Sequence, residues 1–185
     1  MIRSLDFLFS ALGLLVLSPL LILVLILGWF DTRSPLFQQD RVGKNQQSFK
    51  LVKFRTMRPD TASVASHLAD ASAITPLGRY LRRTKMDELP QLWNVLRGDM
   101  SLVGPRPCLF TQQDLIVERA SRGVFSAQPG ITGLAQIQGI DMSTPELLAK
   151  TDAEMLKQLN LFNYLRYIFV TLLGKGAGDR VTTKP

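Results

Sequence analysis

The chain has 185 residues, a net charge of +7 and an isoelectric point near 9.9. This length is typical of one compact domain with a membrane segment and is short for two domains. Its single cysteine excludes an intramolecular disulfide, and its single histidine excludes a metal site built from histidines alone. The basic charge indicates anionic partners, such as nucleic acid, anionic lipid or phosphorylated substrates.

A long apolar run opens the chain. Residues 7–30 carry no charged side chain, and Trp29 and Phe30 end the run where interfacial aromatics are common. A helix of this length can span a hydrocarbon core of about 30 Å. A cleaved signal peptide is disfavoured, because its apolar region is shorter and no A-x-A-like site comes after this one. We expect residues 1–30 to form a membrane anchor and residues 31–185 to form a second unit.

Ser18-Pro19 interrupts this apolar run. Proline lacks an N–H and clashes with the carbonyl four residues earlier, that of Leu15, so we expect a bend there and a compensating bond from the Ser18 hydroxyl. Two topologies remain open: a kinked helix that spans the bilayer, and a re-entrant helix that leaves by the face it entered. The cationic residues after residue 30 favour a cytoplasmic location for the chain beyond the anchor. They do not place the N-terminus, where Arg3 is offset by Asp6.

A basic hairpin is expected next. Residues 35–39 and 48–54 read as short strands, and residues 43–45 supply the turn. The second strand ends in Lys53-Phe54-Arg55, two cations flanking an apolar aromatic residue. The pair is suited to binding one phosphate, whereas the same motif alone is more often a solvated basic strand. Residues 59–75 are expected to form a loop with one helical turn.

The segment from residue 79 to residue 107 carries the chemistry. A helix that starts at Thr75-Pro76 presents cationic side chains, including Arg79 and Arg82. Pro90 favours a second helix that begins at Asp87 and ends at Gly98, with Trp93 on its buried face. Asp87 and Glu88 then lie at a helix N-terminus, where anions bind well. Alone, the pair would read as stabilising first-turn acids.

Arg106 follows one short strand later, between Pro105 and Pro107. The two prolines restrict its backbone, so the guanidinium is held ready for bidentate recognition of a phosphate or a uracil carbonyl. Carboxylates for Mg²⁺, cations for phosphate and a membrane anchor together indicate phosphoryl transfer at a membrane.

The rest of the chain is predicted to be helical. Residues 111–122 and a helix from Thr144-Pro145 are amphipathic. Residues 161–173 are rich in aromatics and too short to span a bilayer, so they suit a helix in the membrane interface, with a core helix as the alternative. The predicted fold class is α+β: a small, mostly helical domain with a short β-hairpin and interfacial helices behind the anchor.

Together these motifs resemble the bacterial sugar transferases, the monotopic phosphoglycosyl transferases that start glycan assembly on undecaprenyl phosphate. The resemblance covers nearly the whole chain and matches the small, catalytic-domain-only members. It is carried by KFRTM at residues 53–57, by RRTxxDELPQLxNVL at 82–96, by GDMSLVGPRP at 98–107 and by PGITG at 129–133.

The resemblance implies a mechanism. Asp87 would be the nucleophile that attacks the β-phosphorus of a UDP-sugar, so that UMP leaves and an aspartyl-phosphosugar forms. Undecaprenyl phosphate would then take the sugar-phosphate, the first membrane step towards O-antigen, capsule, exopolysaccharide or glycoprotein glycans. Mg²⁺ would be held by Asp87 or Glu88, with Glu88 otherwise accepting a proton. Phosphate and nucleotide binding would fall to Lys53, Arg55, Arg79, Arg82 and Arg106.

The resemblance also implies a re-entrant helix broken at Ser18-Pro19, with the catalytic domain on the cytoplasmic face of the bacterial inner membrane. The sequence departs from the family pattern after Gly133, where Leu134, Gln138 and Ile140 replace a Trp, an Asn and an Arg. If those positions select the sugar, no sugar can be transferred from a relative. Membrane lipid is an expected partner and nucleic acid is not; a monomer and a homodimer are both compatible with the sequence.

One alternative is a non-enzymatic, membrane-anchored basic protein that binds nucleic acid or anionic lipid. It leaves the Asp87-Glu88 pair among cations unexplained, and no helix-turn-helix or RNA-binding signature occurs. An inactive member of the same family is a second alternative, which the intact acidic pair disfavours.

Overall fold

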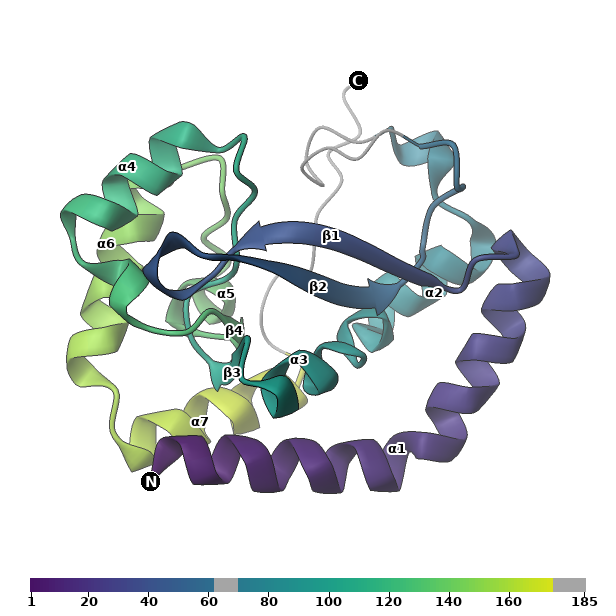
Figure 1. Cartoon of the computed structure of the whole chain (residues 1–185), viewed down its shortest axis with the longest axis horizontal. Coiled ribbons are helices and arrows are strands. Elements are labelled where there is room, and N and C mark those ends of the chain that lie inside the picture. The colour runs from purple at the N-terminus through teal and green to yellow at the C-terminus, as the bar shows by residue number, and fades with distance from the viewer. Residues whose placement is uncertain (62–69, 175–185) are drawn as a thin grey trace.

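The structure is a computed structural model that describes residues 1–61 and 70–174. It is α+β, as expected (Figure 1). Its helices are α1 (Ile2–Thr32), α2 (Pro76–Thr84), α3 (Gln91–Arg97), α4 (Gln113–Ser121), α5 (Leu134–Gln138), α6 (Pro145–Gln158) and α7 (Leu161–Leu172). Its strands are β1 (Leu36–Val42), β2 (Ser48–Phe54), β3 (Ser101–Val103) and β4 (Gly130–Thr132). Short 3₁₀ turns lie at Lys44–Gln46, Ala71–Ala73, Met86–Glu88 and Val124–Ser126.

Helix α1 bends near its middle, where Pro19 lies inside it (Figure 1). The Ser18 hydroxyl donates to the Leu15 carbonyl at 2.7 Å, which is the carbonyl that Pro19 leaves without its helical partner. The expected bend and the expected compensating bond are therefore both confirmed. Among the described residues, α1 is the one helix long and apolar enough to cross a membrane, and 11% of its most apolar stretch is buried.

The amino end of α1 is fixed to the domain by a buried carboxylate. Asp6 is 1% exposed. Its Oδ1 accepts hydrogen bonds from the Ser101 hydroxyl at 3.0 Å, the Leu102 N–H at 2.9 Å and the Tyr164 hydroxyl at 2.8 Å. Arg3 donates to two backbone carbonyls around the end of α3. A single acid in an apolar segment thus ties α1 to β3 and α7.

The expected hairpin is present as the antiparallel pair β1–β2, in which Leu36 lies opposite Phe54 and Val42 lies opposite Ser48. Asn94 of α3 binds the edge of this hairpin through both atoms of its amide. Its Oδ1 accepts from the Val52 N–H at 3.0 Å, and its Nδ2 donates to the Lys50 carbonyl at 2.8 Å. These bonds hold α3 against β2, so the 3₁₀ turn before α3 lies beside the end of that strand.

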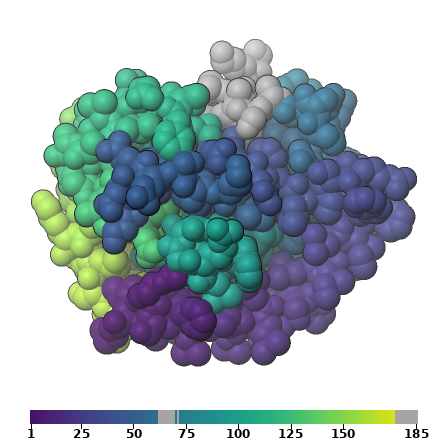
Figure 2. All heavy atoms as spheres, viewed as in Figure 1, coloured from purple at the N-terminus to yellow at the C-terminus, as the bar shows by residue number. Residues whose placement is uncertain are grey.

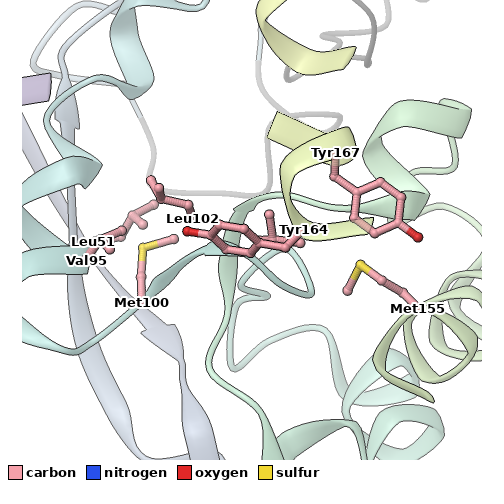
Figure 3. Close-up of a cluster of buried hydrophobic side chains, with 8 residues drawn as sticks. Leu51, Val95, Met100, Leu102, Met155, Tyr164 and Tyr167 are labelled. Carbon is pink, nitrogen blue, oxygen red and sulfur yellow. The ribbon is translucent and has the colours of Figure 1, made fainter. Parts of the chain in front are cut away.

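The main hydrophobic cluster lies where α3, β2, β3, α6 and α7 meet (Figure 3). It contains Leu51, Val95, Met100, Leu102, Val103, Met155, Tyr164 and Tyr167. The expectation that Trp93 is buried is wrong, because its side chain is 53% exposed. The inner face of α3 belongs instead to Gln91, Asn94 and Val95. The polar contact of Asn94 with β2 sets this rotation of the helix.

Helix α7 is amphipathic, with Tyr164 and Tyr167 buried and Phe162 and Phe169 exposed by 75% and 62%. It lies beside the first half of α1 (Figure 1), joined to it through Asp6. In the space-filling view, α1 forms the lower and right edges of the molecule (Figure 2). Most of the large exposed apolar side chains therefore lie on two neighbouring helices, α1 and α7.

Candidate active site

The acidic pair lies in a 3₁₀ turn, Met86–Glu88, directly before α3. The expected start of the α-helix at Asp87 is wrong, since α3 begins at Gln91. Pro90 has no N–H with which to donate to the carbonyl four residues earlier. The chain there forms 3₁₀ hydrogen bonds, each of which reaches the carbonyl three residues earlier. These run from the Glu88 N–H to the Lys85 carbonyl and from the Leu89 N–H to the Met86 carbonyl, each 3.2 Å. The expected stop at Gly98 is confirmed by its φ of 93°.

Lys85 precedes this turn in a left-handed conformation, with φ of 58°. Such a conformation is uncommon for a residue other than glycine and often occurs at functional sites. Burial lowers the pKa of its ammonium group; the charge of Glu88 opposes this shift and that of Arg106 adds to it. Lys85 therefore belongs to the electrostatic surroundings of the acidic pair, a role that its sequence position did not reveal.

Glu88 and Arg106 are brought together as a close ion pair. The Arg106 Nη2 donates to the Glu88 Oε1 at 2.7 Å, and both side chains are largely shielded from solvent. Asp87, next to Glu88, is buried. A pocket enclosing about 310 Å³ of empty space, some of it open to solvent, opens beside the pair. It is lined by Arg41, Leu51, Lys53, Glu88, Gln91, Arg106, Pro107, Gly130 and Ile131.

The two cations at the end of β2, Lys53 and Arg55, lie in different surroundings. Lys53 and Arg55 both lie over the ring of Phe37, at 5.7 Å and 5.3 Å from its centre, while Phe54 between them is buried. Lys53 lines the pocket. Arg55 does not line it, and its Nε donates to the Ser34 carbonyl at 2.8 Å. Of these two expected cations, Lys53 therefore lines the pocket and Arg55 does not.

Helix α2 brings Arg82 to the segment that follows β2. Its Nε donates to the Thr56 hydroxyl at 2.8 Å. Gly78 allows this approach, since a Cβ there would lie 2.0 Å from the Thr56 carbonyl oxygen. Arg79, one turn earlier, is exposed to solvent. Neither arginine lines the pocket, so both lie outside its wall on the α2 side.

Two glycines let the Pro105-Arg106-Pro107 turn pack against the loop that contains β4. Strand β3 pairs with β4 in parallel, with Ser101 opposite Gly130. A Cβ on Gly130 would lie 2.0 Å from the Gly104 nitrogen. The Gly130 N–H donates to the Pro105 carbonyl at 2.9 Å. The two glycine-containing motifs, far apart in the sequence, thus form one wall of the pocket.

Arg41 and Gln91 are pocket residues that the sequence did not single out. Arg41 is buried, and its Nη1 donates to the Pro107 carbonyl at 3.2 Å. The expected strand stopped at residue 39, but β1 continues through Arg41 to Val42. A correct strand length and register would have placed a cation at this end of the hairpin.

Known proteins match this sequence over most of its length. The bacterial sugar transferase family model matches residues 1–175. The UDP-glucose:undecaprenyl-phosphate glucose-1-phosphate transferase of Caulobacter vibrioides is 38% identical over 182 residues, covering 92% of this chain and 67% of that protein. The exopolysaccharide production protein ExoY of Rhizobium meliloti is 35% identical over 188 residues, covering 92% of this chain and 83% of that protein.

Some relatives are much longer than this chain. The UDP-galactose-lipid carrier transferase of Erwinia amylovora is 32% identical, and the match covers 92% of this chain but 39% of that protein. The galactosyl transferase CpsE of Streptococcus agalactiae is 34% identical, and 43% of its length is covered. The matched part includes the acidic turn, the Pro105-Arg106-Pro107 turn and α1, and the chain belongs to the bacterial sugar transferase family.

Proposed function

We propose that the protein transfers a sugar-1-phosphate from a UDP-sugar to undecaprenyl phosphate and releases UMP. The observation that carries the proposal is the Glu88–Arg106 ion pair at a pocket that Arg41 and Lys53 also line, with the buried Asp87 directly before Glu88 in the chain and not itself among the lining residues. Cations so placed suit a diphosphate, and the adjacent carboxylates suit phosphoryl transfer. The names of the relatives from Caulobacter and Erwinia support the donor and acceptor classes.

In the proposed reaction Asp87 is the nucleophile. Its carboxylate oxygen forms a bond to the β-phosphorus while the bond from that phosphorus to the bridging oxygen breaks, and UMP leaves with the electron pair. A phosphate oxygen of undecaprenyl phosphate then attacks the same phosphorus and releases the Asp87 carboxylate. Burial of Asp87 supports this role, because a carboxylate with little water around it is a better nucleophile.

Cationic side chains balance the charge of the diphosphate in this proposal. Arg106 and Lys53 lie at the pocket and would bind the phosphates or the uracil directly, while Arg41, which donates to the Pro107 carbonyl, adds positive charge to the same wall. Arg82, Arg79 and Arg55 lie outside the wall, where they would attract the nucleotide or the lipid phosphate. Glu88 would hold Arg106 in place before the substrate binds.

A magnesium ion fits the acidic turn. Within the described part of the chain no group of three or more His, Cys, Asp or Glu side chains gathers as a self-sufficient metal site. Mg²⁺ is often bound through one or two carboxylates together with substrate phosphates and water, which matches Asp87 and Glu88. When bound, the ion would neutralise charge on the diphosphate and polarise its phosphorus.

We further propose that α1 is a re-entrant anchor, residues 1–30, and that residues 31–185 form the catalytic unit on the cytoplasmic face of the bacterial inner membrane. Residues near both ends of α1 are bonded to the chain beyond the helix: Asp6 through the bonds described above, and Asp31, which begins the second unit, by accepting from the Thr75 hydroxyl at 2.7 Å. The bend at Pro19 lies between these two contacts. The exposed aromatics of α7 support a second contact in the membrane interface.

Thiol labelling tests this topology. A cysteine in place of Ser4, an exposed residue at the amino end of α1, should resist a membrane-impermeant maleimide in intact spheroplasts and react after permeabilisation. The native Cys108 is buried and gives little background. A Lys44→Cys variant in the hairpin turn serves as the cytoplasmic control. Labelling of the Ser4→Cys variant in intact spheroplasts would rule out the re-entrant arrangement.

The non-enzymatic alternative is not favoured, because the match to a transferase family covers residues 1–175. The proposed reaction needs one chain, and it is compatible with a monomer or a homodimer. The sugar is left open: Leu134 and Gln138, which stand at departures from the family pattern, belong to α5 and do not line the pocket.

A UMP-release assay tests the proposed function. The purified protein in detergent is incubated with undecaprenyl phosphate, Mg²⁺ and, separately, UDP-glucose, UDP-galactose, UDP-N-acetylglucosamine and other UDP-sugars. We expect UMP to be released with at least one sugar, together with a lipid-diphosphosugar product. Removal of Mg²⁺ with EDTA should stop the reaction. No UMP from any UDP-sugar, with the protein folded, would overturn the proposal.

A further inference from the structure

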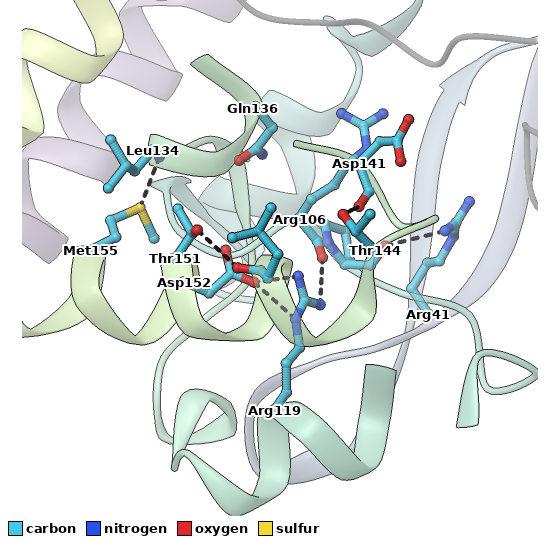
Figure 4. A network of polar contacts seen from close by, with 12 residues as sticks. Arg41, Arg106, Arg119, Leu134, Gln136, Asp141, Thr144, Thr151, Asp152 and Met155 are labelled. Carbon is cyan, nitrogen blue, oxygen red and sulfur yellow. Dashed lines mark hydrogen bonds and ion pairs between the residues drawn. The ribbon is translucent and has the colours of Figure 1, made fainter. Parts of the chain in front are cut away.

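The backbone of the Pro105-Arg106-Pro107 turn is held by an unbroken series of hydrogen bonds to its carbonyls. The Pro105 carbonyl accepts from the Gly130 N–H at 2.9 Å, and the Cys108 carbonyl accepts from the Val42 N–H at 2.9 Å. The two carbonyls between them accept from buried arginine side chains. Arg119 donates to the Arg106 carbonyl at 2.8 Å and Arg41 donates to the Pro107 carbonyl at 3.2 Å (Figure 4).

The two prolines explain why the turn is held through its carbonyl groups. Pro105 and Pro107 have no N–H, so the turn has few donors with which to anchor itself to its neighbours. Its carbonyls are the remaining strong backbone groups. Donors from β1, β4 and α4 each take one of them, so the turn is fixed from three directions.

Arg119 is itself held by a buried ion pair. Its Nε and Nη2 donate to the Asp152 Oδ2 at 3.0 Å and 2.7 Å, and the two side chains are 2% and 0% exposed (Figure 4). Burial raises the pKa of the Asp152 carboxyl, and Arg119 opposes that shift. A buried ion pair is a poor way to join two helices, because apolar residues of similar volume often stabilise such a contact better. The third guanidinium nitrogen of Arg119, Nη1, donates to the Arg106 carbonyl in the turn. This contact gives a reason for an ion pair at this place.

The position of this turn decides where the Arg106 guanidinium lies. That group meets Glu88 at 2.7 Å, next to Asp87 and at the edge of the pocket. A shift of about 1 Å at a reacting site can lower a rate by about 10²-fold. Small movements of the Arg106 backbone would therefore separate it from Glu88 and from a bound phosphate.

We infer that Arg119, braced by Asp152, and Arg41 are positioning residues that set the place of Arg106 for the transfer reaction. Neither is assigned a chemical step. The inference rests on the proposed function for its kinetic consequences, but the way the turn is held is a property of the protein without substrate.

Cys108 provides a probe of the turn that does not depend on activity. It follows Pro107 directly, it is the single cysteine of the chain and its side chain is 0% exposed. Burial raises the pKa of its thiol, an effect that the nearby Arg119 and Arg41 partly offset. A loosened turn should expose this thiol to a reagent, so the rate of labelling reports on how firmly the turn is held.

The test uses Arg119→Lys, which keeps a positive charge for Asp152 but has one nitrogen in place of the three that Arg119 uses. Arg122→Lys is the matched control, because Arg122 lies just beyond α4 and pairs with Glu118 near the surface. We expect kcat/KM for the UDP-sugar to fall by about 10–100-fold in Arg119→Lys and to stay within about twofold in Arg122→Lys. Cys108 labelling should accelerate by about 10-fold or more only in Arg119→Lys.

A double-mutant cycle separates positioning from general stabilisation. Because Arg119 is inferred to act through Arg106, adding Arg119→Lys to an Arg106→Lys protein should change kcat/KM by less than about twofold. Full additivity of the two losses would overturn the inference. Arg41→Lys is the second variant, with the same expected pattern, and it decides the matter if Arg119→Lys does not fold.

The rate of Cys108 labelling also separates a failure of the proposed function from a failure of the positioning inference. If the wild-type protein releases no UMP from any UDP-sugar, the proposed function fails, and Cys108 labelling alone decides whether the arginines hold the turn. A Tyr164→Phe variant controls for general loss of stability, since the Tyr164 hydroxyl bonds to Asp6 and not to the carbonyls of the turn. Equal labelling of Cys108 in Tyr164→Phe, Arg119→Lys and Arg41→Lys would overturn the inference.

Discussion

Replacement of Asp87 by Asn is expected to lower the rate of sugar-phosphate transfer by about 10³-fold or more while the protein stays folded. Asparagine has nearly the size and shape of aspartate, so the buried position and the 3₁₀ turn tolerate it. A carboxamide, however, is a very poor nucleophile towards phosphorus. UMP release measures the rate, and circular dichroism with a thermal melt checks the fold.

The matched control is Asp40→Asn. Asp40 lies on β1 and pairs with Lys50 at the surface, with 57% of its side chain exposed. Exposed ion pairs contribute little, so this change should leave both activity and stability near those of the wild type. An Asp87→Asn protein that kept more than about a tenth of the wild-type rate would exclude Asp87 as the nucleophile.

Replacement of Asp6 by Ala is expected to lower the free energy of unfolding by about 3–5 kcal/mol. The change leaves the Tyr164 hydroxyl, the Ser101 hydroxyl and the Leu102 N–H without their shared acceptor in a buried position. It also removes the carboxylate that lies 3.8 Å from Arg3. Denaturation of the purified protein in detergent, followed by tryptophan fluorescence, measures the effect.

Two further variants give reference values for the loss of stability in Asp6→Ala. Tyr164→Phe removes one of the three bonds to Asp6 and should cost about 1 kcal/mol. Leu15→Ala, on the exposed surface of α1, should change stability in detergent by less than about 0.5 kcal/mol. If Asp6→Ala were no less stable than Tyr164→Phe, the carboxylate would not be what fixes α1 to the domain.

Features set by local chemistry were predictable from the sequence. The bend at Pro19 and the end of α3 at Gly98 follow from the backbone properties of proline and glycine. The hairpin follows from alternating strands around a turn. The predicted start of α3 is too early, because Pro90 cannot donate to the Met86 carbonyl, which accepts from the Leu89 N–H, and a 3₁₀ segment forms at the acidic pair.

The site was predictable only where its residues carry a sequence motif. Glu88, Arg106 and Lys53 line one pocket, and each lies in a dense local pattern of charge, proline or aromatic residues. Arg41 was missed, since its role depends on the register of β1 and on a carbonyl many residues away. The Arg119–Asp152 pair was missed for the same reason, because helix periodicity shows neither partner nor burial.

The role of Asp6 was predictable only in part. An acid at the edge of an apolar run signals a buried partner, because an unpaired carboxylate is costly away from water. The sequence offered Arg3 as the nearest cation, and that interpretation hid the acceptor role towards Ser101 and Tyr164. Tertiary packing of α1 against β3 and α7, which no local pattern encodes, supplied the partners.

In the proposed reaction the sugar-phosphate passes through a covalent bond to Asp87. The most direct measurement is to incubate the protein with a UDP-sugar carrying ³²P at the β-phosphorus and with Mg²⁺, but without lipid, and to follow protein-bound label. We predict that wild-type protein retains label, that Asp87→Asn does not, and that added undecaprenyl phosphate transfers the label to lipid. Wild-type protein that forms the lipid product at full rate but never carries label would contradict the account.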